Sequence, residues 1–88
     1  MKVLKNVIDI EKEGLLALLG ENVTIFCLNY IYHGRLVGVN DSCVKLEDPS
    51  IVYETGKFTD KDFKDIQSLN VESFYVAMNC IESFGKLK

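Results

Sequence analysis

Side chains that could carry acid–base or nucleophilic chemistry are few in this chain of 88 residues. His33 is the single histidine, and it precedes Gly34 in a stretch rich in β-branched and aromatic residues. On the outward face of a strand, such a histidine is more often a surface residue than a general base. The chain has no Gly-x-Ser-x-Gly motif and no glycine-rich phosphate loop. Because catalysis needs a positioned nucleophile, base or metal ion, we expect no enzyme and no cofactor.

Metal ligands and disulfides are equally poorly represented. Carboxylates alternate with lysines between residues 57 and 70, which is typical of a solvated face, although carboxylates this close could hold a cation weakly. Cys27, Cys43 and Cys80 are odd in number and widely spaced, with no Cys-x-x-Cys pair. We therefore expect no metal site and no disulfide framework. The three thiols are interpreted as small buried hydrophobes of a reduced, cytoplasmic protein.

Length and composition indicate one domain with a thin core. A chain of this size buries only about 60% of its unfolded surface. Nevertheless, 48% of its residues are hydrophobic, which suggests that part of the apolar surface is buried against another subunit. The formal charge of −3 argues against a general nucleic-acid coat, without excluding a local basic patch. We see no signal peptide and no apolar run of membrane-spanning length, so we expect no membrane partner.

Hydrophobic patterns predict the elements that would position any site. A helix is expected over residues 9–19, with Asp9 as N-cap and Gly20 just beyond its end. Alternating apolar residues predict strands, at 21–29, 31–40, 43–54, 71–78 and 80–84. Asp48-Pro49-Ser50 interrupts the third strand, either as a turn or, as we favour, as a bulge in one long strand. Residues 57–70 are expected to form a variable insertion, either a short helix or a solvated loop.

Gly34 and Gly38 stand on one face of the second strand, although glycine weakens a strand interior. Glycines at such positions leave room where a strongly bent sheet closes on itself. The pattern therefore predicts a small barrel, in which these two glycines are structural residues.

Three stretches resemble the Sm/LSm family, and its small phage-encoded members of marine origin in particular. LLGENVTIFCL is similar to the end of the family's helix and its first strand. YHGRLVGVND is similar to the second strand, and VKLEDPSIVYETG to the third. The resemblance implies a mainly β protein, namely one Sm-like domain over residues 1–88. Its parts would be an N-terminal α-helix, a first Sm motif at 21–56 and two last strands at 71–84, in a strongly bent five-stranded, SH3-like barrel.

The family also implies a homo-oligomeric ring that binds single-stranded RNA, but here the base-reading residues are altered. The family's Asp-x-x-Met-Asn turn falls on residues 40–44, where Met and Asn are absent, and its Ile-Arg-Gly motif falls on 76–79, where Arg and Gly are absent. The remaining RNA-binding candidates are Asn40, Asp41, Ser42, Met78 and Asn79. Arg35 and Lys45 could supply charge. Each has a plainer interpretation as a turn former or a solubilising residue.

Two functions stay open from the sequence. The first is an RNA-binding ring, whose repeated turns would multiply a weak site. The second is a structural or protein-interaction ring without RNA. In both, apolar residues of the last two strands would pair subunits edge to edge, and the expected inter-subunit residues are Tyr75, Val76 and Ile81.

Overall fold

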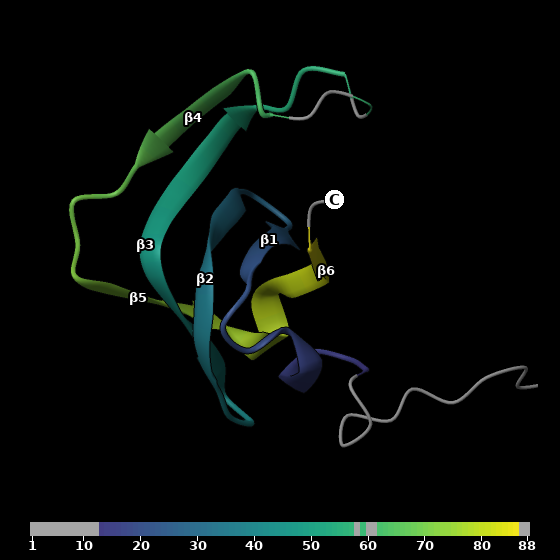
Figure 1. Ribbon diagram of the computed structural model, residues 1–88, viewed down its shortest axis with the longest axis vertical. Helices are drawn as coiled ribbons and strands as arrows, with labels where there is room; N and C mark the ends of the chain where they lie inside the picture. Colours follow the sequence, from purple (N-terminus) through teal and green to yellow (C-terminus); the bar gives the residue numbers. More distant parts are fainter. Residues whose placement is uncertain (1–12, 58, 60–61, 87–88) are drawn as a thin grey trace, which may run out of the picture.

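The computed structural model describes residues 13–57, 59 and 62–86. They form one antiparallel sheet, shown in Figure 1, so the mainly β class is confirmed. Its six strands are β1 (Asn22–Cys27), β2 (Ile31–Val39), β3 (Cys43–Glu54), β4 (Asp65–Ser68), β5 (Ser73–Ala77) and β6 (Ile81–Lys86). Within the described residues the only helices are two short 3-10 helices, η2 (Leu16–Leu18) and η3 (Met78–Cys80).

The prediction of an α-helix over residues 9–19 is wrong for its described part. Only η2 is helical there, and residues 9–12 lie outside the described ranges. Gly14 has a φ of +74°, which an α-helix cannot accommodate. Leu15 and Leu18 lie in the segment predicted to be helical, and both pack against the core of the sheet.

The strands follow the order β4-β3-β2-β1-β6, and β5 also pairs with β3. The first half of β3 pairs with β5 and its second half with β4. The two short strands therefore succeed one another along a single edge of β3, as Figure 1 shows. Among the described strands no hydrogen-bonded ladder joins β5 to β6, so the closed five-stranded barrel is corrected to an open, curved sheet of six strands.

A bulge bends β3 in its middle, as expected, and no turn divides it. Asp48 adopts a positive φ of 51°, and the partner of β2 jumps from Ser50 to Glu47 across Gly34. A Cβ atom on Gly34 would lie only 3.1 Å from the carbonyl oxygen of Glu47. Gly34 is thus the point of closest approach between the two bent strands.

Gly38 is under less constraint than Gly34. A Cβ atom there would lie 3.4 Å from the Cβ of Lys45, which is ordinary van der Waals contact. Both glycines were predicted to be structural residues of a barrel, but only Gly34 is required by a close approach.

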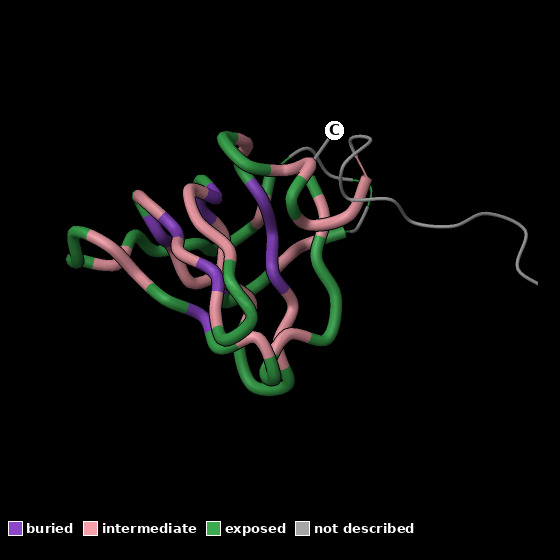
Figure 2. The backbone as a smooth tube through the Cα atoms, turned by 90° about the horizontal axis from the view of Figure 1, so that it is seen from below, coloured by how far each residue is buried: buried purple, intermediate pink, exposed green. Residues whose placement is uncertain are grey.

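The core is drawn from four strands, β1, β2, β3 and β5. Its fully or almost fully buried members are Val23, Ile25, Leu36, Val44, Leu46 and Val76. The buried stretches, purple in Figure 2, all belong to strands, and no residue of the described connections is buried. Alternation of side chains produces much of this pattern in β2 and β3, whereas β1 buries three successive residues, 23–25.

Residues 57–70 do not form the predicted helix in their described part. Instead, Asp65–Ser68 is strand β4 on the edge of β3, and the Leu69 N–H donates to the Pro49 carbonyl oxygen (2.8 Å). Phe63, Ile66 and Leu69 have the three-residue spacing of a helix, but the segment forms a strand because β3 offers it an unpaired edge. Phe63 packs its ring edge-on against His33, with ring centroids 5.8 Å apart.

Candidate functional site

Two connections meet at one end of the sheet. The turn at residues 40–42 joins β2 to β3, and η3 joins β5 to β6. Because Cys43 at the start of β3 pairs with Ala77 at the end of β5, both connections leave from the same place. The Met78 N–H donates a hydrogen bond to the Ser42 carbonyl oxygen at 2.8 Å. The two groups of RNA-binding candidates are therefore neighbours.

Asn40 uses its side-chain oxygen inside its own turn. The Oδ1 atom accepts hydrogen bonds from the backbone N–H groups of Ser42 (2.7 Å) and Cys43 (2.8 Å). This arrangement supports the plainer interpretation of Asn40 as a turn former. Asn79 differs, since it is exposed and its Oδ1 atom accepts a bond from the Cys80 thiol at 3.6 Å. Its amide is the more available of the two.

The charges near these turns do not form a basic face. Asp41 is the one charged residue within 40–42 and 78–80. The two cations named as candidates have partners within the chain: Arg35 forms an exposed ion pair with Glu47, and the Lys45 ammonium lies 5.8 Å from the centre of the Tyr75 ring. A phosphate approaching the turns would therefore meet little uncompensated positive charge.

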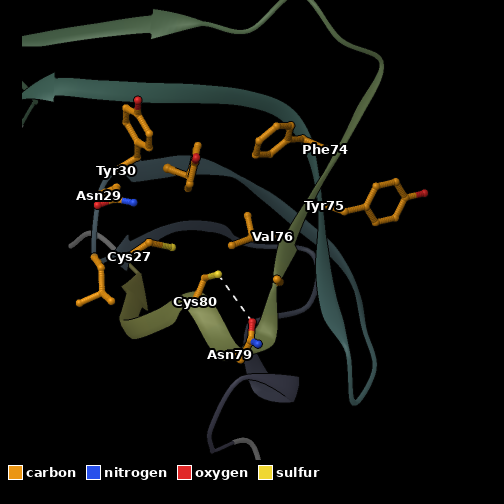
Figure 3. A pocket seen from close by; sticks show the side chains of 11 residues that line it. Cys27, Asn29, Tyr30, Phe74, Tyr75, Val76, Asn79 and Cys80 are labelled. Atoms are coloured by element: carbon orange, nitrogen blue, oxygen red, sulfur yellow. Dashed lines mark hydrogen bonds between the residues drawn. The ribbon is translucent and has the colours of Figure 1, made fainter.

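A pocket of about 260 Å³ lies beside η3, on the side away from the turn at residues 40–42. Figure 3 shows that it is lined by the β1–β2 connection, by β5 and by η3. Its lining is largely aromatic and aliphatic, and within it the rings of Tyr32 and Phe74 lie 5.1 Å apart. Asn79 stands at this pocket as well as beside the Asn40 turn.

Sequence reasoning missed this pocket, because its lining comes from segments separated by more than 40 residues along the chain. One signal was available: both faces of the strands predicted at 21–29 and 71–84 were apolar. Apolar residues on both faces leave some of them without cover inside a single protomer.

The predicted inter-subunit residues occupy three different environments. Tyr75 is 58% exposed on β5, whereas Val76 is 4% exposed and belongs to the protomer's own core. Ile81 is partly buried and packs against that core. Phe84 was not predicted, yet it pairs with the buried Ile25 and is still 40% exposed, because none of the described strands pairs with the outer side of β6.

His33 is held on the opposite face of the sheet, away from the pocket. Its Nδ1 atom shares a hydrogen bond of 3.1 Å with the hydroxyl of Thr24, and burial lowers the pKa of its imidazole. Thr24 is buried, so no substrate carbonyl group could approach its hydroxyl. The pair has the character of a buried structural hydrogen bond.

The pocket favours the neutral forms of the groups that line it. Burial, with smaller contributions from nearby thiol and phenol groups, raises the pKa of Tyr32. In the part of the chain that the structure describes, no three His, Cys, Asp or Glu side chains come close enough to bind a metal ion together. The pocket is therefore suited to apolar or aromatic groups.

Comparison of the chain with models of protein families, with curated proteins and with solved structures finds no match. Among residues 13–57, 59 and 62–86, no helix has the length and apolar character needed to cross a membrane.

Proposed function

We propose that this chain is the protomer of an Sm-like, homo-oligomeric ring. One observation carries the proposal: β5 pairs only with β3, and β6 pairs only with β1, so each strand has one edge without a partner among the described strands. Two different free edges on one chain can pair head to tail between copies, and such contacts form a ring when the rotation closes.

The strand arrangement supports an Sm-like protomer. A helical turn precedes β1, the second strand is bent at Gly34, and a short 3-10 turn links the last two strands. Strands β4 and β5 lie one after the other along the same edge of β3. The six strands therefore occupy five positions across the sheet. Pairing with neighbours would extend this open sheet in the way the family resemblance implies.

A second copy of the chain is the occupant we propose for the pocket. Tyr75 and the pocket lie at the free edge of β5, while Phe84 is half-exposed at the free edge of β6. If β6 of one copy paired with β5 of the next, Phe84 would be brought to an aromatic surface. Burial of these rings would supply the apolar contact that the thin core lacks.

A charged residue on the free edge of β5 tests this proposal. Tyr75→Glu should dissociate the ring, because it places a carboxylate in the contact, while the nearby Lys45 ammonium can pair with the new charge and preserve the fold. Tyr53→Glu is the matched control: Tyr53 is 59% exposed but lies on β3, which has a strand on both sides. Sedimentation velocity should show smaller species for Tyr75→Glu only. Equal sizes for both variants would oppose the proposal.

RNA binding at the two adjoining turns is the second candidate function. The hydrogen bond between Met78 and Ser42 favours it, because it brings the Asn79 amide to the Asn40 turn in every copy. Base edges could pair with these amides, and repetition around a ring would add up weak contacts. The paired state of Arg35 and the presence of Asp41 oppose strong binding. An interaction ring without RNA is therefore the better supported of the two.

A further inference from the structure

Cys27 and Cys80 line the same pocket from adjacent elements. Cys27 is the last residue of β1, and its partner across the ladder is Ile81, the residue directly after Cys80. Figure 3 shows both sulfur atoms turned toward the interior of the pocket. Both cysteines are free thiols.

The environments of the two thiols differ in a way that gives them different roles. Cys80 is exposed and open to reagents in solution. Cys27 is partly buried; burial raises the pKa of its thiol, and the nearby Cys80 raises it further. Cys43 stands apart, since it begins β3 opposite Ala77 and does not line the pocket.

We infer that Cys27 and Cys80 are a redox-active pair that forms a reversible disulfide across the pocket, with a small-molecule disulfide such as oxidised glutathione as the oxidant. The Cys80 thiolate attacks one sulfur of the oxidant, which forms a mixed disulfide and releases the first glutathione thiolate. The Cys27 thiol then loses its proton to solvent and attacks the Cys80 sulfur. The bond to glutathione breaks, and the second glutathione leaves.

Atoms and electrons balance in this reaction. The two cysteine thiols are oxidised to one disulfide, and one molecule of oxidised glutathione is reduced to two thiols. The new bond would tie the end of β1 to η3 and narrow the pocket between them. The inference concerns a bond within one protomer and does not require the proposed assembly. A second copy seated in the pocket would slow the reaction, because it would cover Cys80.

The test uses the reduced, full-length chain with oxidised glutathione. Trypsin separates the three cysteines onto three peptides, residues 13–35, 36–45 and 65–86, so each linkage has its own mass. We expect an intact mass lower by two hydrogen atoms and a linked pair of peptides 13–35 and 65–86. Dithiothreitol should restore the original mass. In denaturant the preference for this pair should disappear, because the fold creates it.

Single variants separate the two steps. In Cys27→Ser the glutathione adduct on Cys80 should persist, because the resolving thiol is gone. In Cys43→Ser the Cys27–Cys80 bond should form as in the parent chain. The inference is overturned if the parent chain keeps stable adducts on Cys80, if Cys43 is linked instead, or if non-reducing gels show the bond between two chains. It is also overturned if the same selectivity survives in denaturant.

Discussion

The Met78 N–H group donates a hydrogen bond of 2.8 Å to the carbonyl oxygen of Ser42 and so fixes two connections of the sheet to one another. These residues are far apart in the sequence, but the pairing of β3 with β5 brings them to the same end of the sheet. Any ligand of this end would contact both connections at once. The same bond places η3, which carries Asn79 and Cys80, between the turns and the pocket.

Replacement of Gly34 by valine should destabilise the protein by roughly 3 kcal/mol, the upper part of the range for overpacked sites. The new Cβ would meet the Glu47 carbonyl oxygen at 3.1 Å and the Pro49 Cα at 3.3 Å, and backbone atoms cannot move aside as a flexible side chain can. The free energy of unfolding in urea is the quantity to compare between variant and parent.

Gly38→Val is the matched control on the same strand. Its nearest contact would be the Cβ of Lys45 at 3.4 Å, so we expect a loss below about 1 kcal/mol. Equal losses at the two positions would contradict the special role given to Gly34 opposite the bulge.

Stability should decrease as the pH falls through the range in which histidine titrates. Burial lowers the pKa of His33 below its ordinary value of 6.5, so the unfolded chain binds a proton that the folded chain resists. The contribution of neutral His33 is therefore complete above about pH 6.5 and is lost as the pH falls through the folded pKa. Urea unfolding between pH 7.5 and pH 5 measures this effect.

His33→Gln is the control for this measurement, since its carboxamide can still hydrogen-bond to Thr24 but does not titrate. The parent should lose more stability than the variant over the same range, while carboxylates contribute equally to both. Parallel curves would show that His33 is not held in its neutral form.

RNA binding at the adjoining turns should be weak and should diminish steeply with added salt. Asn40→Asp retains the oxygen that accepts from Ser42 and Cys43, so it tests the amide without removing the hydrogen bonds of the turn. Combined with Asn79→Ala, it should abolish binding to short U-rich and A-rich RNAs in fluorescence anisotropy.

Light scattering on the double variant provides the control for assembly, because neither change touches the free edges of β5 and β6. Tight binding that survives both changes would place an RNA site elsewhere on the protein.

The strands and the bulge were predictable because their signals are local. β-branched and aromatic residues are frequent in β1 and β2, and Pro49, which cannot donate to a ladder, marks the irregularity in β3. The close approach at Gly34 was predictable from the unfavourable presence of glycine in a strand. In each case one short segment contains the physical cause.

The elements that sequence reasoning missed depend on partners distant in the chain. Strand β4 forms where the pattern suggested a helix, because the second half of β3 offers it a ladder. Gly14 lies inside the predicted helix but has a positive φ of 74°, which a regular α-helix does not allow. The pocket requires Cys27, Phe74 and Cys80 to be neighbours, which only the pairing of β6 with β1 and of β5 with β3 brings about.

The mass of the purified protein in solution tests the proposed ring most directly. Multi-angle light scattering over a series of dilutions should give a single mass that is several times that of the 10.0 kDa protomer. This mass should be the same at every micromolar concentration. A folded protein with a mass of 10.0 kDa at micromolar concentration would contradict the proposal, because the free edges of β5 and β6 would then have no partner.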